Sequence, residues 1–228
     1  MNKIIRNFGA GVAMCMMMVG CTTNFEEYNT NPYQPGKVPA NSLLSTMFKV
    51  YASPQQNDCQ AINCMWACFS GQITAPYDWG KGRNLFAYYN AMEDHNRASW
   101  GTIYGQIYPN FFRIEEATEK KGVIYAMAQL TRIYAMQLMA SLQGPIPYSK
   151  VTSGDIKSLY DDEPTAWRAM FDDLDNVITI LKSAAELGIN QDLATVDQFY
   201  GGDCAKWVKF ANTLKLRMAI RVSGVADY

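Results

Sequence analysis

A short segment rich in aromatic and polar side chains is the first place where the residue types suggest chemistry. The segment Ala75–Asn96 contains a proline and two glycines without a helical or strand period, so we expect a loop. Flat rings stack on sugar rings, while carboxylate, amide and guanidinium groups hydrogen-bond sugar hydroxyls. The loop therefore predicts a ligand site composed of Tyr77, Asp78, Trp79, Arg83, Asn84 and Tyr88. The alternative is that these rings pack onto helices beneath the loop.

Nucleophilic and metal chemistry find little support in the sequence. His95 is the only histidine and no G-x-S-x-G motif occurs, so we expect no catalytic triad. Cys59, Cys64 and Cys68 have a spacing that fits neither zinc nor the usual iron–sulfur sites. We interpret these cysteines as small apolar core residues and predict no metal and no cofactor.

Asp172, Asp173 and Asp175 form an acidic cluster in the sequence. Such a cluster could indicate a calcium site or the active site of a glycosidase. The D-x-D-x-D-G loop of a calcium site is absent, so we expect these side chains on a solvated helix face. A hydrolase with paired carboxylates stays an alternative, because the distance between carboxyl groups in space decides that chemistry.

The first residues have the pattern of a secretory signal. Lys3 and Arg6 precede an apolar stretch, and small residues come before Cys21. Met18–Cys21 resembles a lipobox, whose cysteine receives lipid after cleavage, so we predict lipidation of Cys21. The predicted organisation is a signal peptide at 1–20, an extended tether at 21–40 and a helical domain at 41–228. An ordinary signal peptide or a buried helix is the alternative.

Composition limits the class of protein. The chain has 228 residues, of which 49% are hydrophobic, which is enough for one domain with a sizeable core. The net charge of −1 and the lack of a basic stripe argue against binding to nucleic acid.

Apolar residues recur with the helical period through most of the chain, and strand-type alternation is almost absent. We predict helices at 41–53, 57–74, 99–121, 123–142, 160–187 and 203–223. Pro109 predicts a kink in the third of these helices. The predicted fold is therefore all-α, with helical hairpins that stack on one another.

The last predicted helix, Asp203–Ser223, has two apolar stripes. Trp207, Phe210, Ala211, Leu214, Met218 and Val222 form one stripe, and Leu216 and Ile220 form a second stripe on the opposite side. A helix that is apolar on two sides is expected to pack on both, at the centre of a stack. Arg217 and Arg221 lie at the edge of the first stripe and are expected in buried pairs.

Several segments resemble motifs of the SusD/RagB family. Lys206–Ser223 resembles the family block W-x-K-F-A-N-[ST]-L-[KR]-L-R-x-A-x-R-[IV]-S, and Asn24–Pro32 resembles its opening phrase. Trp100–Ile107 looks like its W-x-x-[IV]-Y-x-x-[IL] helix. Gly144–Ser149 is similar to its Y-G-[DP]-[IV]-P-[YF]-S turn, although Gln143 stands in place of the usual tyrosine.

The resemblance implies a nutrient-binding lipoprotein on the outer membrane, with a superhelix of the tetratricopeptide (TPR) kind and no enzymatic activity. The implied ligand is a glycan oligosaccharide or a peptide. The implied partner is a SusC-like TonB-dependent transporter, over which the lipoprotein closes. Family members are longer, so the resemblance also implies that this chain is an N-terminal portion. The alternatives from other classes are a surface glycoside hydrolase and a structural helical scaffold of the outer membrane.

Overall fold

Helices and short connections build the part of the chain that the structure describes. A computed structural model describes residues 38–52, 67–74, 97, 100–101, 103–154, 157–190 and 192–225. In chain order the elements are α3 (Ala40–Ala52), α5 (Ala67–Phe69), the π-helix η3 (Ile103–Ile107), α7 (Tyr108–Thr118), α8 (Gly122–Gln143), α9 (Glu163–Leu187), the 3₁₀-helix η4 (Leu193–Thr195) and α10 (Cys204–Val222). Within these ranges the only strand-like pairing is one bridge, between Ile146 and Asp161. The all-α prediction is confirmed.

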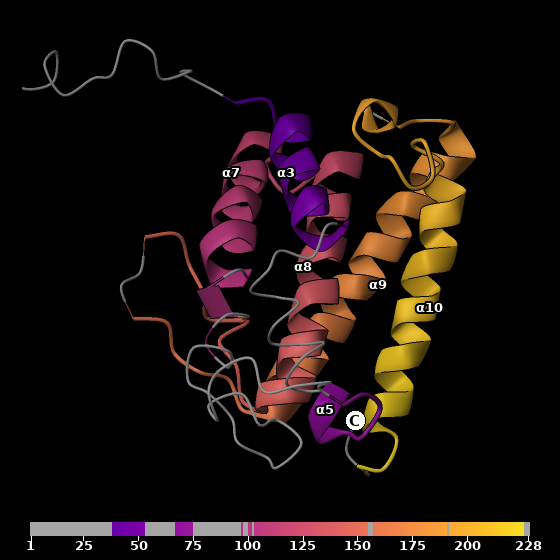
Figure 1. The fold of residues 1–228 in the computed structure, drawn as a ribbon. Helices are drawn as coiled ribbons and strands as arrows, with labels where there is room; N and C mark the ends of the chain where they lie inside the picture. Colours follow the sequence, from indigo (N-terminus) through magenta and orange to yellow (C-terminus); the bar gives the residue numbers. More distant parts are fainter. Residues whose placement is uncertain are drawn as a thin grey trace, which may run out of the picture. The chain divides into compact units, whose positions relative to one another are not determined.

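Successive long helices pack against each other in a stack. α7 and α8 contact each other, α8 contacts α9, and α9 contacts α10, while α3 covers α7 and α8 (Figure 1). The joint between α7 and α8 is three residues long, so these two helices form an antiparallel hairpin. The predicted stack of helical hairpins is therefore confirmed.

Local sequence signals set the starts of the last two long helices. Asp162 Oδ1 accepts a hydrogen bond from the Thr165 amide at 2.8 Å, and Pro164 occupies the first turn of α9. Asp203 Oδ1 accepts from the Lys206 amide at 3.1 Å, which caps α10. Gly202 has φ +83°, and a Cβ there would meet the Ala194 backbone nitrogen at 2.7 Å, so this turn requires glycine.

The core is centred on α8, which other elements cover on nearly every side. Its residues from Val123 to Ile133 are all buried, because this run is apolar nearly all round. Trp167 on α9 and Trp207 on α10 are 3% and 6% exposed, so each indole fills the space between neighbouring helices. The core face expected for α9 comprises Trp167, Met170, Phe171, Leu174, Val177, Ile178 and Leu181. All of these residues are buried except Phe171, which is half-buried against the core.

The predicted continuous helix at 99–121 is wrong in detail. A π-helical segment, η3, runs from Ile103 to Ile107, and the regular helix α7 begins directly after it and ends at Thr118. Pro109 gives the physical reason. Proline has no amide hydrogen, and its ring collides with the carbonyl four residues earlier, so the backbone before it widens instead of continuing the regular hydrogen-bond pattern.

The expectation that α10 is packed on two sides is also wrong. Leu216 and Ile220 are 61% and 65% exposed, and Arg217 and Arg221 are exposed instead of buried in pairs. Within the described ranges, α9 and part of α8 cover one face of α10. Arg221 Nη2 reaches the Ser141 carbonyl at 3.4 Å, which is a weak surface contact.

Two helix boundaries near the start of the described chain differ from the predicted ones. α3 begins at Ala40, one residue before the predicted start at 41. The helix predicted to reach Thr74 ends at Phe69 in α5. Cys68 is 8% exposed and reduced, in agreement with a core role, and Cys59 and Cys64 lie outside the described residues.

Candidate functional site

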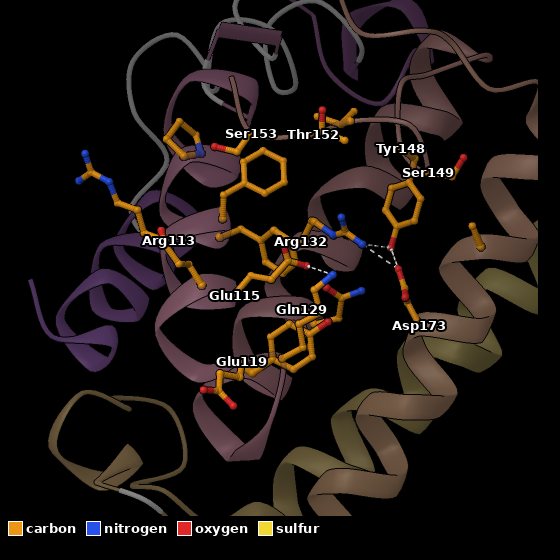
Figure 2. A pocket seen from close by; sticks show the side chains of 18 residues that line it. Arg113, Glu115, Glu119, Gln129, Arg132, Tyr148, Ser149, Thr152, Ser153 and Asp173 are labelled. Carbon is orange, nitrogen blue, oxygen red and sulfur yellow. Dashed lines mark hydrogen bonds and ion pairs between the residues drawn. The ribbon is translucent and has the colours of Figure 1, made fainter. Parts of the chain in front are cut away.

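A polar groove opens between α7, α8, the first half of α9 and the segment 148–153 (Figure 2). Its volume is about 1080 Å³, which is enough for a ligand of several sugar or amino-acid units. Helix α7 contributes Glu115 and Glu116 to the lining, its C-cap residue Glu119 also lines the groove, and α8 contributes Gln129 and Arg132. Most of the lining side chains are polar or charged.

Arg132 is the charged centre of this groove. It is 8% exposed, although it belongs to the most apolar helix of the structure. Its Nη2 donates hydrogen bonds to Asp173 Oδ2 at 2.7 Å and to Tyr148 Oη at 3.1 Å (Figure 2). Its Cζ also lies 4.4 Å from the ring centroids of both Phe111 and Tyr148. The carboxylate and the two ring faces together offset the loss of hydration of the guanidinium.

Tyr148 and Asp173 complete the network. Tyr148 Oη donates to Asp173 Oδ2 at 2.6 Å, so one carboxylate oxygen accepts from both the tyrosine and the arginine. Burial raises the pKa of Tyr148 well above its usual value, Arg132 acts against this shift, and the Asp173 charge adds to it. Tyr148 therefore remains a protonated donor at neutral pH. The network fixes α8, α9 and the segment after α8 relative to one another.

Asp161 holds the backbone of that segment in place. Its Oδ2 accepts from the amides of Tyr148 at 3.0 Å and Ser149 at 2.7 Å, and its Oδ1 accepts from Ser149 Oγ at 2.7 Å. Lys150 Nζ lies 3.4 Å from Oδ1. Burial alone would raise the pKa of Asp161, but the hydrogen bonds from Ser149, Tyr148 and Lys150 outweigh burial and lower the pKa. The Asp161 carboxylate therefore fixes the backbone that carries the Tyr148 ring.

Gln129 lines the groove with a buried side-chain amide that is not hydrogen-bonded to the described residues. Its side chain is 1% exposed, and neither Nε2 nor Oε1 has a hydrogen-bond partner among the residues that the structure describes. Leaving such a buried group unpaired costs about 1–3 kcal/mol. The nearby rim carries a surface ion pair between Lys120 Nζ and Glu115 Oε1, 3.2 Å apart, in which the lysine side chain is 67% exposed.

Tyr108 lies next to this network on α7. Burial raises its pKa to about 12, with Arg132 opposing the shift and Asp173 and Asp161 adding to it. Its hydroxyl has no partner within the described ranges, and its ring stacks on the Tyr104 ring with centroids 5.1 Å apart. Tyr104 Oη donates to the Pro147 carbonyl at 2.9 Å, which ties η3 to the segment after α8.

The residues predicted to bind ligand, Tyr77, Asp78, Trp79, Arg83, Asn84 and Tyr88, all fall within 75–96, outside the described residues. The same is true of Cys21, so the ligand loop and the lipid site stay predictions. For the described residues, no group of three or more histidine, cysteine or acidic side chains could hold a metal.

Sequence reasoning missed the groove and misjudged Asp173. That residue was expected on a solvated face together with Asp172 and Asp175, and it instead pairs with Arg132. A signal for this pairing does exist, because Arg132 is the only charged residue of α8. A lone charge in an apolar helix needs a partner, but the sequence does not say which acid provides it.

The family model and the solved structures that match this chain agree on one family. The family model described as Susd and RagB outer membrane lipoprotein matches residues 22–227. A SusD-like protein from Bacteroides thetaiotaomicron VPI-5482 is 71% identical, with a TM-score of 0.77 over 82% of this chain and 39% of its own. A SusD homologue from Bacteroides ovatus ATCC 8483 is 33% identical, with a TM-score of 0.70 over 83% of this chain and 38% of its own.

A chitin-binding SusD homologue from Flavobacterium johnsoniae is 26% identical, with a TM-score of 0.73 over 82% of this chain and 39% of its own. None of the curated proteins searched matches the chain. The chain spans about two fifths of the length of these three relatives.

None of the described helices is both long and apolar enough to cross a membrane. The match of the family model to nearly the whole sequence, together with the 71% identical relative, shows that this chain belongs to the SusD and RagB family of outer membrane lipoproteins.

Proposed function

We propose that the protein is a lipid-anchored binding protein of the outer-membrane surface that captures an oligosaccharide and delivers it to a SusC-like TonB-dependent transporter. The observation that carries this proposal is the family match over residues 22–227. The chitin-binding relative supports a saccharide as the class of ligand. A peptide is the alternative ligand within the same function.

The ligand contacts proposed for this chain are those of the aromatic loop: Tyr77, Asp78, Trp79, Arg83, Asn84 and Tyr88. Ring stacking supplies the shape of a sugar site, and the polar side chains supply hydrogen bonds to hydroxyls.

A glycan array followed by titration calorimetry with the strongest ligand tests this function. Specific binding without turnover supports it. Release of shorter sugars from the bound oligosaccharide would instead identify a surface hydrolase, and absence of binding to every glycan and peptide would favour a scaffold.

Anchoring and delivery are separate parts of the proposal. The anchor is a lipid on Cys21, which follows the apolar segment at the position where lipoproteins are cleaved. Mass spectrometry of the mature N-terminus tests it, and an unmodified N-terminus or membrane retention of Cys21→Ser would contradict it. Delivery predicts that a tagged copy isolated from outer membranes brings down a TonB-dependent transporter. Isolation of the protein without such a transporter under mild detergent would contradict this partner.

A further inference from the structure

We propose that the groove between α7, α8 and α9 is a second saccharide site, in which the amide of Gln129 binds two adjacent hydroxyls of one sugar unit. This inference rests on the proposed function. It concerns a place distinct in sequence from the aromatic loop, and its starting observation is the buried amide with an unpaired donor and an unpaired acceptor.

The chemistry of the missing partner follows from the amide itself. A glutamine side chain presents an N–H donor and a carbonyl acceptor side by side in one plane. Two neighbouring sugar hydroxyls match this pair, because one can accept from Nε2 while the other donates to Oε1. A group that only donates or only accepts, such as an ammonium or a phosphate oxygen, would leave half of the amide unpaired.

The charges around Gln129 favour a neutral ligand. The groove is lined by four carboxylates and three cationic side chains, so neither sign dominates. The most deeply buried of these charges, Arg132, is already paired through Nη2 with Asp173 and Tyr148, so its positive charge is largely offset, although its Nε has no partner among the described residues. Polar oxygens of Ser149, Thr152 and Ser153 also line the groove, where they can hydrogen-bond further hydroxyls (Figure 2).

Access to the amide requires a rim side chain to move, because Gln129 itself has almost no contact with solvent. Lys120 lines the same groove and is suited to this movement. Its side chain is 67% exposed, and among the described residues its ion pair is the surface contact with Glu115. Surface ion pairs of this kind contribute little free energy, so a ligand can displace the lysine at small cost.

The first test compares two buried amides on the same helix. Gln129→Leu removes the unpaired amide, and the matched control Gln137→Leu removes the amide of a residue outside the groove whose Nε2 donates to the Tyr134 carbonyl. We expect Gln129→Leu to melt at the same or a higher temperature than the parent protein, since it removes an unpaired polar group. A clear loss of stability in Gln129→Leu would show that the amide already has a structural partner, and would overturn the proposal.

The second test detects binding at the amide directly. In a protein labelled with ¹⁵N at glutamine, maltohexaose, cellohexaose and chitohexaose are titrated while the side-chain amide signals are observed. We expect at least one of them to shift the Gln129 signal and not the Gln137 signal, and to bind roughly tenfold more weakly to Gln129→Leu. An uncharged pentapeptide is titrated in parallel. A shift of the Gln129 signal by the peptide but by none of the sugars would overturn the choice of a saccharide.

These outcomes separate the second site from the proposed function. Sugars that bind with Trp79-dependent affinity but do not shift the Gln129 signal would overturn this inference and leave the function intact. Absence of binding of all three sugars and of the peptide at either place would overturn this inference, and absence of binding to every glycan of the array and to peptides would contradict the proposed function as well.

Discussion

Removal of the Asp173 carboxylate is the sharpest perturbation of the Arg132 network. In Asp173→Ala the guanidinium of Arg132, which is 8% exposed, loses its only ion-pair partner among the described residues. Tyr148 Oη loses the acceptor of its 2.6 Å hydrogen bond at the same time. Breaking a buried ion pair from one side typically costs 3–5 kcal/mol.

The geometry places the expected cost at the lower end of that range. The Asp173 side chain is 34% exposed, so water can enter the space that it leaves and can hydrate Arg132 in part. We therefore expect Asp173→Ala to lower the free energy of unfolding by about 3 kcal/mol. For a protein of this size that loss corresponds to a fall in Tm of about 6–12 °C.

Thermal and urea unfolding measure this effect, with Asp172→Ala as the control, because Asp172 is an exposed carboxylate one position earlier on the same helix. The double variant Arg132→Met/Asp173→Leu should be more stable than Asp173→Ala, because it removes both the buried guanidinium and the carboxylate that pairs with it. A Tm of Asp173→Ala within 1 °C of the parent would refute the reasoning. A double variant less stable than the single one would show that the arginine is stabilised by the rings and not by the carboxylate.

Three further predictions concern the core, the loop and the turn after α8. Trp207→Ala should lower the free energy of unfolding by roughly 3–5 kcal/mol, because the indole is 6% exposed and donates to Asp197 Oδ2 at 2.7 Å; near-parental urea unfolding would contradict the packing of this residue. Trp79→Ala should weaken saccharide binding by about threefold to tenfold in calorimetry with little change in Tm, and unchanged affinity with a lower Tm would assign the loop to packing. Because the pKa of Asp161 is lowered in the folded protein, its contribution to stability is fully present above the ordinary carboxyl pKa of about 3.9 and is lost as the pH falls through its lower folded value. Unfolding curves of Asp161→Asn measured from pH 7 to pH 2 should therefore converge with those of the parent at the acid end, and a constant difference across this range would contradict the prediction.

The class of fold and most helix positions follow from local patterns in the sequence. The apolar period marks α8, α9 and α10. The predicted start of the last helix at 203 lies one residue before α10 begins, and the predicted start at 160 lies three residues before α9 begins. These signals are local, because a cap or an apolar stripe depends on residues within a few turns of one helix. The motif at Lys206–Ser223 also identified the family, since it preserves residue types in register over a whole helix.

Which helix faces are covered and which charges pair depends on how the helices pack together in space. The stripe of Leu216 and Ile220 has a helical period whether or not a neighbour covers it, and the part of the chain that the structure describes leaves it exposed. Arg132 and Asp173 are 41 residues apart, and their pairing depends on how α8 and α9 are aligned. Alignment is set by the sum of many packing contacts, which no short window of sequence contains. The unpaired amide of Gln129 has the same origin, because a missing partner is a property of the surroundings and not of the glutamine.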